Sequence, residues 1–159
     1  MSAVLKNWQQ SIDPQILDLA AEAVHNKCTG KRTFSNLMAQ ELQAKLHSLS
    51  HTAHTMSEPH HQLAAALALR VRDIIMVISF APQTTPVLRL VELAKSRGVF
   101  IIAITQNNSP LASRGDRLLS VEAAEPHDAM NLMDVVILQT ITIESLAILV
   151  RMKQSEPAG

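Results

Sequence analysis

The chain has 159 residues and a mass of 17.4 kDa, the size of one typical domain, and 47% of its residues are hydrophobic. This composition excludes disordered and collagen-like chains. The 14 basic and 14 acidic residues cancel, so the chain lacks the positive field that attracts nucleic acid, and we expect no nucleic-acid partner for this domain. We predict a single domain over residues 1–159, with 1–12 as a linker or N-terminal arm and 154–159 as a flexible tail.

Cysteine usage and hydropathy bear on the cellular location. The single cysteine, Cys28, cannot form an intramolecular disulfide, and the chain opens without a basic-then-apolar leader, so we expect a cytoplasmic protein. Residues 132–150 are nearly long enough to span a bilayer. They carry Asp134, Gln139 and Glu144, which are costly in hydrocarbon, so we predict a buried helix of a soluble protein and no membrane partner.

Capping signals and apolar periodicity predict two helices near the start of the chain. The first covers about residues 14–25, after Asp13 as its N-cap. The second begins near Thr33 or Ser35 and carries one apolar stripe. Only residues 26–30 remain between them, so a first strand would be short or absent.

Further along the chain, continuous apolar runs of strand length alternate with helical patterns. The predicted elements are a helix at 57–70, a strand at 74–80, a helix at 85–98, a strand at 99–105, a short strand at 117–121 and a helix at 130–152. Strand, helix and strand in succession build a parallel βαβ unit, so we predict an α/β fold.

The last helix has two apolar faces between narrow polar stripes. The two faces are Val135, Val136, Ile143, Leu146 and Val150, and Ile137, Ile141 and Ile148. One face can cover the sheet and the other needs a second partner, so we predict a homodimer to which this helix contributes. The alternative is a helix buried on both faces within one monomer.

The loop after the first long apolar run suits a phosphate group. In an open parallel sheet, ligands bind beyond the carboxyl ends of the strands. Residues 79–85 end a strand and open a helix, whose N-terminus offers free N–H groups and the positive end of the helix dipole. Ser79, Thr84 and Thr85 add hydroxyl donors. In the alternative, purely structural interpretation, Thr85 caps the helix and Ser79 hydrogen-bonds the loop.

A series of motifs resembles the SIS (sugar isomerase) domain. They are Ile-Ile-Met-Val-Ile-Ser ending at Ser79, Thr84, the run Ile101-Ile102-Ala103-Ile104-Thr105, Ser109-Pro110-Leu111-Ala112 and Asp116. Two further segments, Gly30-Lys31-Arg32-Thr33 and Glu58-Pro59-His60, resemble the first loop and a helix entry of RpiR-type regulators. The resemblance covers about residues 13–153.

The resemblance implies a three-layer α/β/α sandwich around a parallel, five-stranded, flavodoxin-like (Rossmann-like) sheet. It also implies a homodimer and a pocket for a sugar phosphate or amino-sugar phosphate, without a cofactor. Ser79 and Thr84 match the phosphate-loop hydroxyls, and Thr33 or Ser35 matches the serine of the first loop. The expected phosphosugar-binding residues are Lys31, Arg32, Thr33, Ser35, His60, Ser79, Gln83, Thr84 and Thr85.

The phosphate loop departs from the Ser-x-Ser-Gly-x-Thr pattern of the family. Ala81 stands where a second serine is expected and removes a hydroxyl donor. Pro82 stands where glycine is expected, removes a backbone N–H and fixes φ near −65°. Lys31 and Arg32 either compensate as phosphate-facing charges or are solvated on a surface turn.

Isomerisation of a sugar phosphate would need a base within reach of the substrate. The candidates are His25, Glu58, His60, His61 and Glu144, and no motif assigns the role to any of them, so no catalytic residue is predicted.

A histidine series raises the question of a metal. If the second helix extended to His54, then His47, His51 and His54 would share a face and could ligate a metal. We favour a partly solvated helix end instead and predict no metal site.

Three functional hypotheses follow. The leading one is a phosphosugar-binding SIS domain that acts as the effector sensor and dimerisation module of a sugar-metabolism transcription regulator, and residues 4–13 resemble the linker to the DNA-binding module of such proteins. The alternatives are a small isomerase of the phosphoheptose or arabinose-phosphate type, and a degenerate SIS domain that only dimerises.

Overall fold

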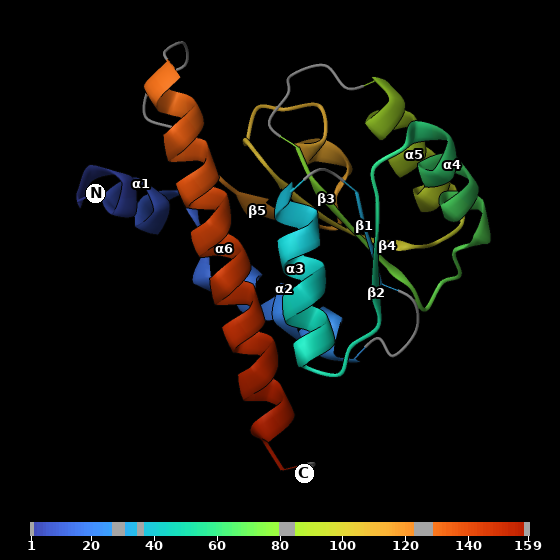
Figure 1. Ribbon diagram of the computed structural model, residues 1–159, viewed down its shortest axis with the longest axis horizontal. Coiled ribbons are helices and arrows are strands. Elements are labelled where there is room, and N and C mark those ends of the chain that lie inside the picture. Colours follow the sequence, from blue (N-terminus) through green and yellow to red (C-terminus); the bar gives the residue numbers. More distant parts are fainter. Residues whose placement is uncertain (1, 27–30, 35–36, 80–84, 123–128, 158–159) are drawn as a thin grey trace.

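Helices cover both faces of a parallel sheet, in three layers (Figure 1). The computed structural model describes residues 2–26, 31–34, 37–79, 85–122 and 129–157. The elements are α1 (Ser2–Ser11), α2 (Pro14–Asn26), β1 (Lys31–Phe34), α3 (Leu37–Ser48), β2 (Ala53–Met56), α4 (Pro59–Ala68), β3 (Ile74–Ile78), α5 (Thr85–Ser96), β4 (Phe100–Thr105), the 3-10 helix η1 (Ala112–Arg114), β5 (Arg117–Ser120) and α6 (Ala129–Ser155). The predicted α/β fold with a parallel sheet is confirmed.

The strands lie in the order β2-β1-β3-β4-β5, and every neighbouring pair is parallel. Ile78 pairs with Ile104, and Thr105 pairs with Ser120. Because the strands are parallel, their carboxyl ends meet at one edge, which we call the carboxyl edge. From β1, the chain adds β2 on one side of the sheet and then β3, β4 and β5 on the other side. Ligands of open sheets of this kind bind at the point where this direction changes, which here lies between the carboxyl ends of β1 and β3.

Side chains alternate between the two faces of the sheet and fill a separate core on each. Ile74, Met76 and Ile78 pack with α2, α3 and α6. Ile75 and Val77 pack with α4 and α5 on the other face. All five residues of β3 are buried, which explains the continuous apolar run seen in the sequence.

The region around β1 differs from the sequence prediction. The helix predicted to begin near Thr33 or Ser35 begins at Leu37, and Lys31–Phe34 form a four-residue strand. This strand pairs with β2 on one side and β3 on the other. The backbone hydrogen bonds to these two strands therefore hold the segment in an extended conformation, although its apolar residues recur at helical spacing. The first strand was predicted to be short or absent, and it is short. It lies after residues 26–30 and not within them.

The strand β2 was not predicted, because its four residues at the edge of the sheet carry a weak apolar pattern in which only Ala53 is buried. Before it, α3 ends at Ser48, and Ser50 has a positive φ of 61°. The helix therefore does not extend to His54. No group of three or more metal-ligating side chains lies within the described residues.

Both ends of the described chain dock on the rest of the domain. Residues 2–11, predicted as a linker or N-terminal arm, form α1, and Trp8 docks on α6 with its indole Nε1 donating to Thr142 Oγ1 at 2.9 Å. At the other end, α6 continues to Ser155, and Gln154 Nε2 donates to the carbonyl oxygen of Leu49 at 2.6 Å.

One face of α6 packs into the core and the other is exposed. Ile143, Leu146 and Val150, which belong to one of the two predicted apolar faces, are fully buried. From residue 133 of α6 onward, the exposed large apolar side chains are Met133, Val136, Ile148 and Met152. Thus Val136 departs from its predicted face. In the described part of the chain, residues 133–155 are the one segment long and apolar enough to cross a membrane, and part of this helix is buried in the core beside the sheet.

Candidate functional site

Three hydroxyl side chains follow or end adjacent strands at one level of the carboxyl edge. Ser79 comes directly after β3, and its N–H donates to the carbonyl oxygen of Ile104 at 3.1 Å, so it continues the pairing of β3 with β4. Thr105 ends β4 and is paired with Ser120, which ends β5. Sequence reasoning identified Ser79 from the end of its apolar run, and the pairing adds Thr105 and Ser120.

The three hydroxyls lie on the face of the sheet that carries α4 and α5. Ile78, Ile104 and Leu119 belong to the opposite core, and the residue after each must point the other way. Thr105 and Ser120 are buried, at 2% and 6% exposure, whereas Ser79 is half-buried. Ser79 is therefore the member of this row that a ligand can reach most readily.

Glu122 is a carboxylate at the same edge that sequence reasoning missed. Its Oε1 accepts a hydrogen bond from the backbone N–H of Asn107 at 2.6 Å and another from the hydroxyl of Ser120 at 3.0 Å. It thereby joins the loop after β4 to the end of β5, and the contact with Ser120 places it on the same face as the hydroxyl row. The alternation of side chains along the predicted strand at 117–121 could have indicated on which face of the sheet Glu122 lies. Its hydrogen-bond partners could be identified only from the register between β4 and β5.

The loop after β4 is held by side-chain hydroxyls. Thr105 Oγ1 donates to Ser109 Oγ at 3.0 Å, and Ser109 Oγ in turn accepts from the N–H of Ala112 at 3.2 Å. The Ser-Pro-Leu-Ala motif singled out in the sequence thus shapes the start of η1. These contacts use the Thr105 O–H as a donor and the Ser109 oxygen as an acceptor, so the two hydroxyls position the loop at the carboxyl edge.

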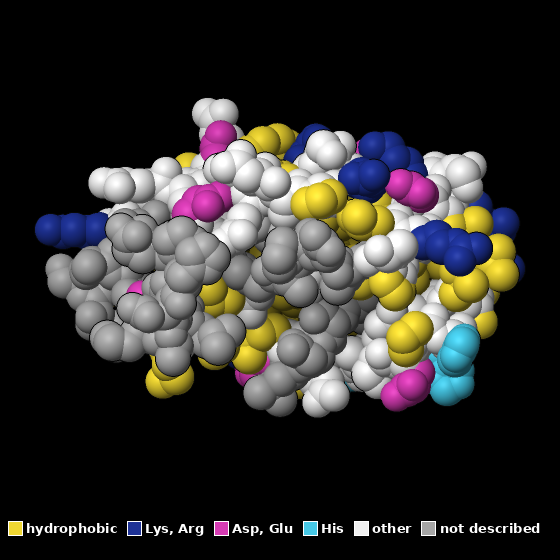
Figure 2. Space-filling model, turned by 90° about the horizontal axis from the view of Figure 1, so that it is seen from above, with side chains coloured by type: hydrophobic (Ala, Val, Ile, Leu, Met, Phe, Trp, Pro, Cys, Tyr) yellow, Lys and Arg dark blue, Asp and Glu magenta, His cyan; other side chains and the backbone are white. Residues whose placement is uncertain are grey.

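The predicted phosphate loop leads from Ser79 to the N-terminus of α5. Thr85 is the first residue of α5 and is exposed, so the first turn of this twelve-residue helix opens at the carboxyl edge. Gln83 and Thr84, together with Ala81 and Pro82, lie outside the described residues. Figure 2 looks onto the molecule from this side, where acidic and basic side chains are both visible.

The residues predicted for the first loop are distributed differently. Lys31, Arg32 and Thr33 belong to β1 and not to a loop. The backbone of Lys31 pairs with Ile74, the first residue of β3, so it lies at the amino end of the strand, away from the carboxyl edge. Their side chains, and all of Ser35, lie outside the described part of the structure.

His60 lies at the periphery of the carboxyl edge. It is exposed in the first turn of α4, which follows the carboxyl end of β2. The order β2-β1-β3 separates it from Ser79 by the width of β1. Gln62 Nε2 fixes this turn by donating to the carbonyl oxygen of Met56 at 2.9 Å.

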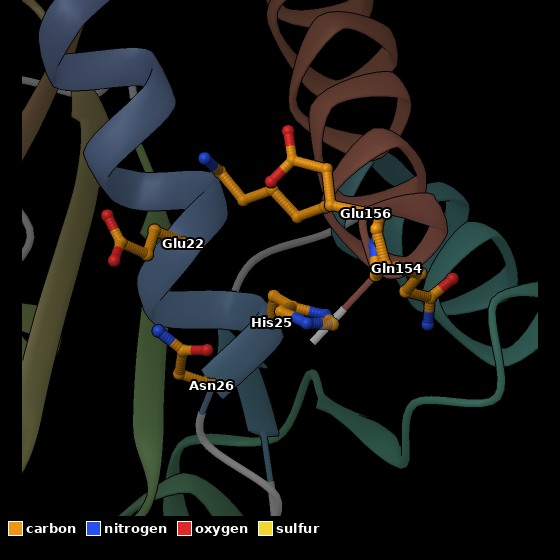
Figure 3. A pocket seen from close by; sticks show the side chains of 7 residues that line it. Glu22, His25, Asn26, Gln154 and Glu156 are labelled. Carbon is orange, nitrogen blue, oxygen red and sulfur yellow. The ribbon is translucent and has the colours of Figure 1, made fainter. Parts of the chain in front are cut away.

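His25, one of the candidate bases, lies in a different place. It lines a polar cavity of about 690 Å³ at the C-terminal ends of α2 and α6 (Figure 3). In this view His25 extends from α2 toward Gln154, whereas Glu22 points away from it. Because α2 leads toward the amino end of β1, this cavity lies at the edge of the sheet opposite the carboxyl edge, and His25 is not part of the candidate site.

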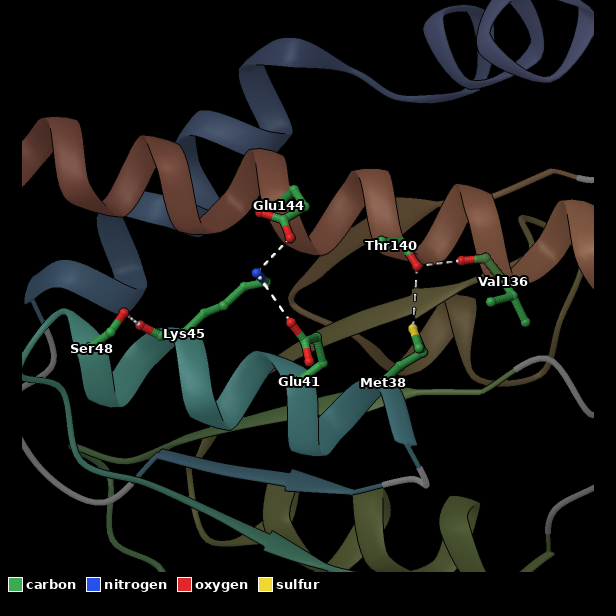
Figure 4. Close-up of polar contacts among 7 residues, drawn as sticks. All are labelled: Met38, Glu41, Lys45, Ser48, Val136, Thr140 and Glu144. Carbon is green, nitrogen blue, oxygen red and sulfur yellow. Dashed lines mark hydrogen bonds and ion pairs between the residues drawn. The ribbon is translucent and has the colours of Figure 1, made fainter. Parts of the chain in front are cut away.

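Glu144, another candidate base, has a structural role. Lys45 Nζ contacts the carboxylates of Glu144 at 2.5 Å and Glu41 at 3.2 Å, which ties α3 to α6 (Figure 4). The hydrogen bond to Glu144 is the main cause that raises the pKa of Lys45 above its ordinary value of 10.5. Next to it, Thr140 Oγ1 donates to the carbonyl oxygen of Val136 and contacts the sulfur of Met38.

A family model described as the SIS domain matches residues 28–149. The match includes every strand of the sheet and the candidate site at its carboxyl edge. The chain belongs to the SIS domain family, as the sequence motifs predicted.

Known proteins similar to this chain include regulators and enzymes. The bifunctional protein glk of Burkholderia thailandensis is 28% identical over 123 residues, which cover 77% of this chain and 19% of that protein. The HTH-type transcriptional regulator RpiR of Escherichia coli K12 is 29% identical over 92 residues, which cover 57% of this chain and 31% of the regulator. This chain thus spans only a small part of the length of the curated relatives that it matches.

Solved structures share the fold at low sequence identity. The NanR protein of Vibrio vulnificus, complexed with ManNAc-6P, superposes with a TM-score of 0.84 at 18% identity, covering 96% of this chain and 61% of that one. The phosphoheptose isomerase GmhA of Neisseria gonorrhoeae gives a TM-score of 0.67 at 19% identity, covering 91% of this chain and 94% of that one.

Proposed function

We propose that this chain is a phosphosugar-binding SIS domain whose ligand lies at the carboxyl edge of β3, β4 and β5. The observation that carries the proposal is that the half-buried Ser79, directly after β3, and the exposed Thr85, the first residue of α5, both lie at the carboxyl edge. A helix N-terminus and a nearby hydroxyl both donate hydrogen bonds to a phosphate. Thr85 at this edge and His60 at its periphery are further proposed contacts, as are Ser35, Gln83 and Thr84, which lie outside the described residues.

The domain serves, in this proposal, as the effector sensor of a cytoplasmic transcription regulator of sugar metabolism. The similarity to the regulator RpiR and to NanR, which was solved with a phosphosugar, supports this role. The wide range of functions within one fold means that the role must be tested on the site itself.

The binding test uses the purified chain in a thermal-shift screen against sugar phosphates and amino-sugar phosphates, with inorganic phosphate and unphosphorylated sugars for comparison. A ligand at a hundred times its dissociation constant adds about 2.7 kcal/mol, or roughly 5–10 °C for a chain of this size. Ser79→Ala removes one donor to a charged phosphate, so the affinity should fall about tenfold or more. Ser96→Ala, at the far end of α5 where the hydroxyl bonds only the carbonyl of Leu93, is the matched control.

We further propose a homodimer to which α6 contributes. The exposed Met133, Ile148 and Met152 on the side of α6 away from the sheet support it, since a soluble domain gains by covering such residues. Sedimentation velocity should show that Ile148→Glu shifts the chain toward the monomer. Val71→Glu, which changes an exposed apolar residue away from α6, should leave the dimer intact.

The second candidate is a sugar-phosphate isomerase. Glu122 favours it, because aldose–ketose isomerisation needs a base and this carboxylate lies at the binding edge. Incubation of the wild-type chain with each ligand found in the screen, followed by NMR of the sugar, distinguishes the two: conversion that is lost in Glu122→Gln supports the enzyme, and binding without conversion supports the sensor. No thermal shift with any phosphate would instead support a degenerate domain that only dimerises.

A further inference from the structure

The carboxylate of Glu122 lies at the carboxyl edge beside the end of β5, two strands away from Ser79. Ser79, Thr105 and Ser120 share one level on three adjacent strands, with β4 between β3 and β5. Two interstrand spacings of about 4.8 Å each put roughly 10 Å between the lines of β3 and β5. This is comparable to the length of a phosphorylated hexose.

The two ends of this span offer opposite charges. The N-terminus of α5 carries the positive end of the helix dipole, and the first-turn N–H groups of a helix, here without that of Pro86, have no partner within the helix, which suits a phosphate. Glu122 contributes a carboxylate at the other end, on the same face of the sheet. A ligand that lies across the span therefore finds a donor-rich end and an acceptor-rich end.

Glu122 is held in place by one of its two oxygens. Within the described residues, its two hydrogen bonds, from the Asn107 N–H and the Ser120 hydroxyl, both go to Oε1. The carboxylate is half-buried, so Oε2 retains acceptor capacity on a side chain whose position is already fixed. A preorganised acceptor binds more tightly because less side-chain entropy is lost on binding.

We infer that Glu122 determines the specificity of this site, favouring a hexose phosphate that carries a free ammonium group over a neutral hexose phosphate and disfavouring a ligand with a second anionic group. This inference rests on the proposed phosphosugar site. The carboxylate forms a charge-assisted hydrogen bond with an ammonium group, a weaker one with a hydroxyl, and repels a second acid.

The test measures, by titration calorimetry, the affinities of three probes: a 2-amino-2-deoxyhexose 6-phosphate, the corresponding hexose 6-phosphate and a 6-phosphorylated hexonic acid. We expect the wild-type chain to bind the amino-sugar phosphate about tenfold or more tightly than the hexose phosphate, and the acid most weakly. Glu122→Gln keeps the acceptor oxygen for Asn107 and Ser120 and removes the charge. In this variant the preference for the ammonium group should disappear and the acid should bind more tightly.

The matched control is Glu22→Gln, which makes the same change of charge at the opposite edge of the sheet and should keep the wild-type preferences. Because the comparison is a ratio of affinities within one variant, a loss of stability in Glu122→Gln does not imitate the expected result. Equal ratios in the wild type and Glu122→Gln would overturn the role of Glu122 while leaving the phosphosugar site in place. Failure of the wild-type chain to bind any of the three probes would instead overturn the proposed function and this inference with it.

Discussion

The hydrogen bond between Trp8 and Thr142 predicts how strongly α1 is coupled to the rest of the domain. Thr142 is fully buried, and its hydroxyl accepts from the indole N–H at 2.9 Å while donating to the carbonyl oxygen of Leu138 at 2.8 Å. Thr142→Val keeps the shape of the side chain and leaves the indole N–H without its acceptor. An unsatisfied, partly buried donor costs about 1–3 kcal/mol. For a chain of this size, that corresponds to a fall of roughly 2–12 °C in the unfolding midpoint.

A double-mutant cycle separates this hydrogen bond from the packing of the indole. Trp8→Phe, Thr142→Val and the double variant are unfolded by urea and followed by circular dichroism. The coupling energy between the two positions should be about 1 kcal/mol, because the loss of the acceptor matters only while the indole is present. A coupling energy within about 0.3 kcal/mol of zero would refute the reasoning and would mean that α1 docks through apolar contact alone.

Three further predictions concern stability. Because the pKa of Lys45 is raised, its ion pairs with Glu41 and Glu144 stabilise the fold fully below pH 10.5, and this stabilisation is lost as the pH rises through the raised value. Between pH 9 and pH 11, urea titrations should therefore show a smaller loss of stability for Lys45→Met than for the wild type, by up to about 1 kcal/mol. An identical pH dependence in the two proteins would contradict the assignment. Gly115→Ala should destabilise by about 1–3 kcal/mol, since the added Cβ would lie 2.9 Å from the carbonyl oxygen of Arg117 and 3.0 Å from the Cβ of Ala103; an unchanged melting temperature would show that the turn relaxes freely. Leu42→Ala should cost about 2–5 kcal/mol in chemical denaturation, because Leu42 is fully buried between α3 and the sheet, and a loss below 1 kcal/mol would mean that the core collapses around the missing atoms.

The sequence was most informative where a segment is buried on every side. Residues 74–80 and 99–105 were predicted as strands because central strands of a parallel sheet need apolar side chains on both faces, and β3 and β4 are such strands. The helix predicted at 85–98, which is α5, was equally clear, because it ends at a glycine. In the structure, Gly98 adopts a φ of +72° just after the end of α5, as expected for a residue that terminates a helix.

The short strands were harder to predict because they depend on their neighbours. Lys31–Phe34 contain two charged residues and no alternating apolar pattern that would mark a strand. They form β1 because β2 and β3 supply hydrogen-bond partners on both sides, and such partners cannot be read from a single segment. The same holds for β2, which is only four residues long.

The candidate site was predictable only where it follows from a single segment. Ser79 was found because it ends a long apolar run before a helix. Glu122 was missed because its significance lies in contacts with Asn107 and Ser120, which belong to different elements. Conversely, the sequence left Glu144 among the candidate bases, and its structural role became evident only from its ion pair with Lys45.

The long helix α6 extends from the carboxyl edge of the sheet to the opposite edge. It begins shortly after Glu122 in the chain and ends beside the polar cavity that contains His25, and its 27 residues correspond to a rod of about 40 Å. The helices α1, α2 and α3 all pack against it along this length. A ligand that tilted the start of α6 by a few degrees would therefore displace its far end by more than an ångström, so the helix would act as a lever with its largest movement farthest from the bound sugar.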